Sequence, residues 1–218
     1  MLSLQLGQFD PAIRHVLCLG AHCDDLEIGC GGTVLRLAEG PKPPVFTWMV
    51  LTSDATREAE ARASAEALLR GAPGSRIIIR KFRDGFLPHE GREVKEAFEE
   101  LKEGPSPDLI LTHYRGDLHQ DHRLISELTW NTFRNHLILE YEIPKYDGDL
   151  GTPNVFVPVD ESLCQRKIDT ILENFASQAG KRWFTPEVFR ALLRLRGMEC
   201  NSPSDYAEAF YCRKLVVR

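Results

Sequence analysis

Two short segments of this sequence concentrate side chains that could bind a metal ion. The first segment holds an imidazole and three carboxylates within six residues: His22, Asp24, Asp25 and Glu27. Burying such groups together is costly unless something compensates their desolvation, and a metal ion bound by imidazole and carboxylate does so. The segment therefore indicates a metal site.

The second segment lies near mid-chain and has residues of the same types: Asp117, His119, Asp121 and His122. Each segment follows an apolar run typical of a buried strand, residues 15–19 and 108–113 respectively. Ligands of open α/β sheets bind just beyond the carboxyl ends of strands, so the two segments can meet in space. His22, Asp25 and one histidine of the second segment would supply three protein ligands. A fourth position would remain for water, which is the composition of a catalytic zinc site.

The elements that must position these residues alternate along the chain. Further strand patterns cover residues 45–52, 76–82, 137–143 and 155–159, followed by a strand-like C-terminal run, and helix patterns cover 28–38, 56–70, 90–102, 122–135 and a segment around 164–175. This order predicts a single α/β domain over residues 1–218, with a mostly parallel, Rossmann-like sheet and helices on both faces. We expect the turn-rich loop 144–153 to border the active site.

The composition excludes several classes of protein. A chain of 218 residues is long enough for one substantial domain, and its net charge of -5 argues against binding to nucleic acid or to an anionic membrane surface. No apolar stretch reaches the length of a membrane span, and the first residues lack the pattern of a signal peptide. The six cysteines are dispersed, which predicts reduced, mostly buried thiols in a cytoplasmic protein. A homo-oligomer is compatible with this sequence.

The two segments resemble the motifs of the LmbE-like, or PIG-L-like, zinc-dependent N-acetylglucosaminyl de-N-acetylases. Their first motif, Ala-His-Pro-Asp-Asp with a following Glu and a glycine-rich turn, is matched at Ala21, His22, Asp24, Asp25, Glu27, Gly29, Cys30, Gly31, Gly32 and Thr33. Their second motif, His-x-Asp-His, is matched at His119, Asp121 and His122. Weaker similarities extend over nearly the whole chain: Arg57, Glu60, Asp84-Gly85, Ser177-Gln178 and residues 207–210. The family usually has proline where this chain has Cys23.

The resemblance implies a metal centre with a defined set of ligands. By correspondence, His22, Asp25 and His122 would bind Zn²⁺. Asp24 would then be the general base that deprotonates the metal-bound water, whose pKa the ion already lowers.

The same correspondence leaves His119 free of the metal. When protonated, its imidazole would polarise the scissile carbonyl or stabilise the oxyanion. Asp121 would hold the other ring nitrogen of His119 and raise its pKa. Because an arginine near this position reaches the substrate in the family, Arg57 is a candidate substrate-binding residue.

Several of these residues also have simpler interpretations. An Asp-Asp pair behind a strand is often a helix cap, and Glu27 fits a supporting or capping group better than a fourth ligand. The spacing of a nucleotide-binding Gly-x-Gly-x-x-Gly turn is absent from residues 29–32, which favours tight helix packing. Cys23 is expected to be a small packing residue, and His113 to be packed or to support the site.

The reaction implied is hydrolysis of the N-acetyl amide of a small-molecule sugar conjugate by metal-activated water. The sequence does not name the group attached to the sugar. One alternative is an amidase that acts on a related thiol or sugar conjugate. Another is a non-haem iron enzyme, since two histidines and a carboxylate also form the iron(II) triad of oxygenases, although that leaves Asp24 without a task. A third is a non-catalytic binding module with a structural metal, which would need four protein ligands.

Overall fold

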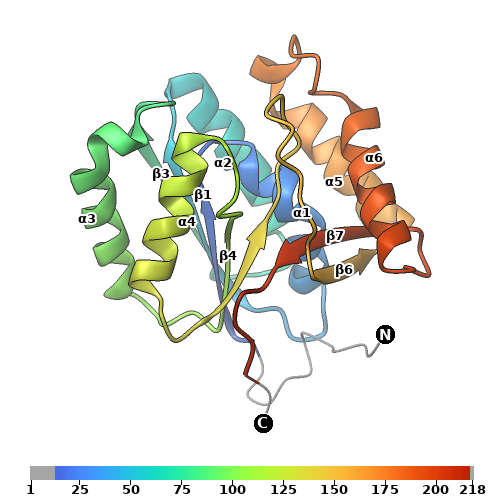
Figure 1. Ribbon diagram of the computed structural model, residues 1–218, viewed down its shortest axis with the longest axis horizontal. Helices are drawn as coiled ribbons and strands as arrows, with labels where there is room; N and C mark the ends of the chain where they lie inside the picture. Colours follow the sequence, from blue (N-terminus) through green and yellow to red (C-terminus); the bar gives the residue numbers. More distant parts are fainter. Residues whose placement is uncertain (1–12, 217–218) are drawn as a thin grey trace.

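The computed structural model describes residues 13–216 and contains one seven-stranded sheet (Figure 1). The strand order is β3-β2-β1-β4-β5-β7-β6, with bounds β1 His15–Gly20, β2 Val45–Thr52, β3 Arg76–Phe82, β4 Leu109–His113, β5 Leu137–Tyr141, β6 Val155–Val159 and β7 Tyr206–Tyr211. The first five strands pair in parallel, while β7 is antiparallel to both β5 and β6. The predicted α/β fold with a mostly parallel sheet is confirmed.

Six α-helices cover the two faces of the sheet: α1 Asp25–Ala38, α2 Ala55–Leu68, α3 Gly91–Lys102, α4 Gln120–Thr132, α5 Glu161–Asn174 and α6 Pro186–Glu199. Helices α3 and α4 lie on one side, and α1, α2, α5 and α6 pack together on the other (Figure 1). Two short 3-10 helices, η2 Leu87–Glu90 and η3 Ala176–Gln178, complete the set. None of the helices in this part of the chain is both long and apolar enough to cross a membrane.

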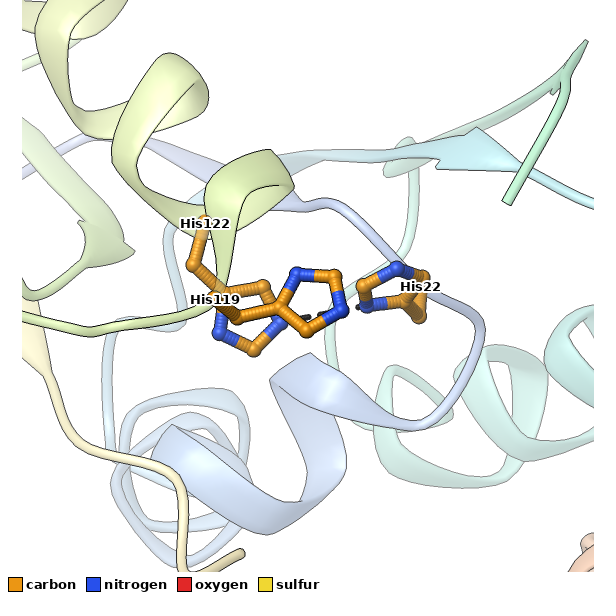
Figure 2. Close-up of side chains that lie close together, drawn as sticks. All are labelled: His22, His119 and His122. Atoms are coloured by element: carbon orange, nitrogen blue, oxygen red, sulfur yellow. Dashed lines mark hydrogen bonds between the residues drawn. The ribbon is translucent and has the colours of Figure 1, made fainter. Parts of the chain in front are cut away.

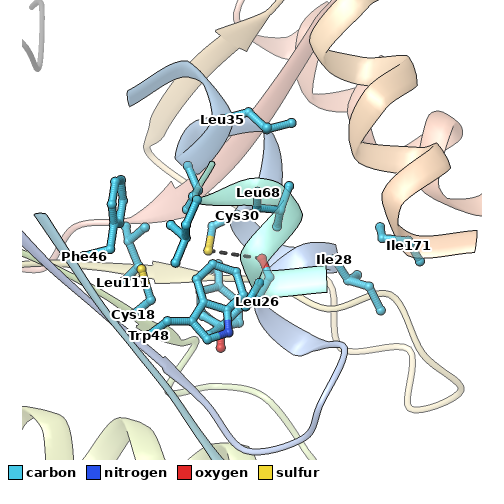
Figure 3. Close-up of a cluster of buried hydrophobic side chains, with 14 of the residues drawn as sticks. Cys18, Leu26, Ile28, Cys30, Leu35, Phe46, Trp48, Leu68, Leu111 and Ile171 are labelled. Carbon is cyan, nitrogen blue, oxygen red and sulfur yellow. Dashed lines mark hydrogen bonds between the residues drawn. The ribbon is translucent and has the colours of Figure 1, made fainter. Parts of the chain in front are cut away.

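The central strand β1 separates two hydrophobic cores. Its residues are all buried, as expected for a parallel strand covered on both faces. Val16 and Cys18 face the core under α1, α2 and α5, while Leu17 and Leu19 face the core under α3 and α4. Figure 3 shows the first core, where Cys18 lies with Trp48 of β2 against side chains of α1 and α2. This packing fixes α1 against the sheet directly behind β1.

The helices begin where the sequence provides capping groups. Asp54, Asp160 and Thr185 each accept a backbone N–H from the first turn of α2, α5 and α6, respectively. Helix α1 begins at Asp25, three residues before the predicted start, and α4 begins at Gln120, two residues before it. Helix α6 has no counterpart among the predicted elements.

The glycines of α1 allow neighbouring elements to approach the helix closely. A Cβ atom at Gly29 would lie 2.2 Å from the Tyr141 ring, and one at Gly32 would lie 3.0 Å from the Glu208 carboxylate. The carboxylate of Glu208 accepts the N–H groups of Gly32 and Thr33, and Lys167 donates both to Glu208 and to the Ile28 carbonyl. The prediction that these glycines serve tight helix packing is confirmed, and a buried ion pair locks α1 in place.

Candidate metal centre

The two predicted segments meet at the carboxyl ends of β1 and β4. These strands are neighbours, and the strand order reverses between them, which is where open α/β sheets bind ligands. His22 follows β1, while His119 and His122 stand at the start of α4. Figure 2 shows the three imidazole rings gathered at this point, with His22 approaching from the opposite side to the other two.

The three predicted ligands bring their donor atoms together. Nδ1 of His22 lies 3.1 Å from Nε2 of His122 and 3.3 Å from Oδ2 of Asp25, and Nε2 of His122 lies 3.4 Å from Oδ1 of Asp25. Ligand atoms about 2.0–2.2 Å from a tetrahedral zinc ion would be about 3.3–3.6 Å apart. The donor set and its spacing fit a metal ion.

In His22 and His122, the ring nitrogen that is not directed at the other predicted ligands lies next to a carboxylate. Nε2 of His22 lies 3.1 Å from Oδ1 of Asp84 and 3.4 Å from Oδ2 of Asp121, and Nδ1 of His122 lies 2.9 Å from Oδ2 of Asp117. Such carboxylates fix the tautomer and orientation of metal-binding histidines and increase their basicity. Each imidazole is thereby oriented with its inner nitrogen toward Asp25.

The centre carries more negative than positive fixed charge. Five carboxylates face two basic side chains, and the seven residues are Asp24, Asp25, Asp84, Asp117, Asp121, Arg57 and Lys145. Although burial disfavours the charged imidazolium, Asp25 raises the pKa of both His22 and His122. The negative charge of Asp25 therefore favours positive charge at this point, and a bound cation would supply it.

Asp24 is placed beside the donor set but is not part of it. Its Oδ1 accepts from Nη2 of Arg57 at 2.9 Å, and Nη1 of Arg57 lies 3.2 Å from Oδ2 of Asp84. Burial and the neighbouring Asp25 raise the pKa of Asp24. Although Asp24 directly precedes α1, its side chain makes no capping hydrogen bond, so the simple cap interpretation does not hold for it.

The pairing expected between Asp121 and the ring of His119 is not the one observed. The Asp121 carboxylate accepts the N–H groups of Gly85 and Leu87 and faces His22. The contact between the two residues is instead from the backbone N–H of Asp121 to Nδ1 of His119, because His119 caps α4. A side chain two residues into the helix points away from that cap.

This cap determines the state of His119. Since Nδ1 accepts a hydrogen bond, the proton of the neutral ring is on Nε2. Burial, together with the positive charges of His122 and His22, lowers the pKa of His119, whereas we expected it to be raised. His119 therefore offers a neutral N–H donor.

His113 and Cys23 lie next to the predicted ligands, but their side chains make hydrogen bonds within the protein. Nε2 of His113 accepts the N–H of Ala21 at 3.0 Å and its ring stacks on His122, so that nitrogen is engaged although it lies 3.2 Å from Asp25. Burial lowers the pKa of His113 to about 4. The Cys23 thiol donates to the Thr52 carbonyl, and burial raises its pKa to about 12. Both behave as the packed groups we expected, and all six cysteines are free.

Three residues of the centre were not among the predicted site residues. Asp84 appeared only as a weak similarity. It contacts His22, and the next residue, Gly85, has a φ of +78°, which suits glycine. Asp117 shares the strand end of His119, which was a usable signal. No signal in the sequence indicates Lys145, since only folding brings the loop after β5 to Asp117. Its contact confirms that loop 144–153 borders the centre.

The comparisons with known proteins identify both the motif region and the fold. The family described as PIG-L, GlcNAc-PI de-N-acetylase, matches residues 17–133, from β1 to the end of α4. N,N'-diacetylchitobiose deacetylase from Pyrococcus horikoshii is similar, with 22% identity, 95% of this chain and 86% of the other covered, and a TM-score of 0.70.

Two other solved structures share the fold. The 4-carboxy-2-hydroxymuconate hydratase GalB from Pseudomonas putida has 16% identity, covers 94% of this chain and 98% of its own, and has a TM-score of 0.74. Teicoplanin deacetylase Orf2, in a form described as zinc-inhibited, has 14% identity, covers 91% and 97%, and has a TM-score of 0.66. The shared fold therefore hosts more than one reaction.

Proposed function

This chain belongs to the PIG-L family, and from that premise we propose that it is a metal-dependent hydrolase that removes the N-acetyl group from an N-acetylglucosamine-type sugar conjugate. The observation that carries the proposal is the convergence of His22, Asp25 and His122 within 3.1–3.4 Å, with Asp24 beside them. Structural sites of zinc are closed by four protein ligands, whereas three ligands leave room for water.

We propose Zn²⁺ as the ion, held by Nδ1 of His22, a carboxylate oxygen of Asp25 and Nε2 of His122. When bound, such an ion lowers the pKa of a water molecule and polarises a carbonyl oxygen. Asp25 also accepts the backbone N–H of His22 at 2.6 Å, which ties the loop after β1 to the first turn of α1. Two of the proposed ligands therefore lie in helices, and the third lies in a loop that is hydrogen-bonded to one of them.

Asp24 is assigned to proton transfer and His119 to stabilisation of charge. Asp24 takes the proton of the attacking water and returns it to the nitrogen of the leaving amine, because its carboxylate is buried, adjacent to the ligands and oriented by Arg57. His119 donates its Nε2–H to the oxygen of the scissile carbonyl as negative charge develops there. Because this histidine is neutral, the hydrogen bond does not require the protonated ring that the sequence led us to expect.

Substrate binding is assigned to Arg57 with Asp84. The Asp84 side chain is 59% exposed although it contacts His22 and Arg57, so it lies at the solvent side of the centre. A carboxylate next to a guanidinium offers acceptors and donors for neighbouring hydroxyl groups of a sugar ring. In this proposal, polar groups that recognise the sugar lie beside the reacting amide.

An amine-release screen tests the proposal. N-acetylglucosaminyl compounds with different attached groups would be incubated with the zinc-loaded protein and with chelator-treated protein, and the free amine and acetate would be measured. We expect equal amounts of both products, only with metal. The matched control is the Asp24→Asn variant, which should bind metal but release little amine.

The same screen separates the alternatives. Amine release from thiol conjugates but not from simple sugars would favour the related amidase. Activity that needs iron and oxygen would indicate an oxygenase. Because one protein of this fold is a hydratase, hydration of an unsaturated carboxylic acid without any amine release would contradict the deacetylase proposal.

A further inference from the structure

A lysine from a distant segment reaches the metal centre through a shared carboxylate. Lys145 lies in the loop after β5, and its Nζ is 2.9 Å from Oδ2 of Asp117. The same Oδ2 is 2.9 Å from Nδ1 of His122. The same carboxylate oxygen therefore contacts both a proposed metal ligand and the amino group of a lysine.

This lysine is fixed rather than free to turn into solvent. Its side chain is 12% exposed, and its ammonium group also donates to Oδ2 of Asp149, an oxygen that accepts the backbone N–H of Leu118. The other oxygen of Asp117 accepts the N–H of His119.

The two partners of Asp117 have opposing effects. A carboxylate that accepts from the outer N–H of a metal-binding imidazole makes that ligand more basic and strengthens metal binding. An ammonium group on the same oxygen draws negative charge away from the imidazole. The relative strength of the His122 and Lys145 contacts at Oδ2 of Asp117 therefore controls how much negative charge reaches a bound metal ion through His122.

We propose that Lys145 is a positioning residue that limits the charge Asp117 passes to His122, so that the bound ion is held less tightly but remains more electrophilic. The proposal rests on the metal site proposed above. It predicts that removing the lysine strengthens metal binding while it slows the reaction. A lysine that served only to hold the loop would, on removal, weaken both.

Zinc affinity, measured by competition with a chromogenic chelator, tests this without reference to activity. Lys145→Met and Lys145→Gln should bind zinc more tightly than the wild type, by on the order of tenfold. Lys145→Arg keeps the charge and should resemble the wild type. Asp117→Asn should bind zinc about 10–100-fold more weakly, because outer hydrogen-bond partners of ligands contribute that much. The two kinds of variant thus move affinity in opposite directions.

Two further variants sharpen the test. In Asp117→Asn/Lys145→Met the shared carboxylate is gone, so affinity should stay close to that of Asp117→Asn rather than recover tenfold. Lys95→Met is the matched control, because Lys95 contacts Glu99 and Thr132, and Thr132 ends α4 at the opposite end from His122. Its zinc affinity and turnover should equal those of the wild type.

The outcomes separate this inference from the proposed function. The role of Lys145 is contradicted if zinc binding is unchanged or weaker in both Lys145→Met and Lys145→Gln. If Asp117→Asn nevertheless binds zinc more weakly, the proposed metal site is still supported. Failure of the wild type to bind zinc, or wild-type affinity in His122→Ala, overturns the metal site itself. Tighter zinc with a lower kcat in the neutral variants supports the proposal.

Discussion

Helix α1 touches a buried charge cluster at its start and another at its middle. At its start, Asp25 faces His22 and His122. At its middle, Lys167 and Glu208 bind to backbone groups of the helix. These five side chains are almost completely buried.

The two clusters differ in whether the protein itself supplies a counter-charge and hydrogen-bond partners for the buried groups. The Lys167–Glu208 pair has one charge of each sign, and its atoms find hydrogen-bond partners in the chain. At the metal centre, ligand atoms crowd within 3.1–3.4 Å of one another and carboxylates outnumber basic groups. Buried charge alone therefore does not indicate function, but buried charge that lacks its counterpart calls for a bound cation.

Replacing His122 by alanine should have the largest effect. The variant should lose stoichiometric zinc and all measurable amine release, because one of three ligands is gone. The metal-free protein should remain folded, although its free energy of unfolding should fall, since Asp25 and Asp117 each lose a basic partner. Metal analysis and urea unfolding of the chelated protein check both points. Full retention of zinc in this variant would contradict the assignment of His122 as a ligand.

Replacing Lys167 by methionine should have the opposite outcome. Leaving the buried Glu208 carboxylate without its counter-ion should lower the free energy of unfolding by about 3 kcal/mol. Zinc stoichiometry should stay at the wild-type value under conditions where the variant is folded. Urea unfolding measures the loss, Lys95→Met serves as control, and Lys167→Met/Glu208→Gln should recover part of it. A stable variant that cannot bind zinc would break the comparison.

Asp24→Asn tests whether chemistry and metal binding can be separated within the metal centre. Turnover should fall by roughly a hundredfold or more, the usual scale for a positioned acid–base group, while zinc content stays unchanged. The amide is nearly isosteric, so packing is preserved. Steady-state kinetics with metal analysis check this. A rate close to that of the wild type would require another base.

Glu27 lies on α1 between the two clusters and should show the smallest effect. Within residues 13–216 its carboxylate oxygens have no hydrogen-bond partner, and burial raises its pKa from 4.5 to about 8. The folded protein therefore holds a proton that the unfolded chain releases near pH 4.5, so the contribution of Glu27 to stability falls as pH rises from about 4.5 to about 8.

The variant Glu27→Gln does not titrate and should avoid this loss. Its melting temperature in the metal-free protein should rise relative to the wild type as the pH is raised from 5 to 8, because only the wild type loses this contribution over that range. Thermal unfolding at several pH values measures the difference, with exposed Glu93→Gln as control. A difference between Glu27→Gln and wild type that is constant with pH would show that the carboxyl is not protonated in the fold.

The sequence by itself determined the fold class and the place of the centre. Apolar runs followed by clustered ligands indicated two strand ends, and a parallel sheet brings such ends to one edge. Motif spacing identified the family and nominated His22, Asp25 and His122. It also indicated the close packing at Gly29 and Gly32, because glycines in a helix next to a strand leave room for neighbours.

Only the tertiary structure decided which groups complete the centre. The pairing of Asp121 with His22 and of Asp117 with Lys145 depends on where helix α4 begins and on how the loop after β5 folds back. Neither is visible in spacing along the chain, because side-chain direction changes by about 100° with each helical residue. The same holds for Lys167 and Glu208, which are 41 residues apart and become partners only by packing around α1. Local sequence fixes which ligands are available, whereas the balance of charge around them is a property of the assembled fold.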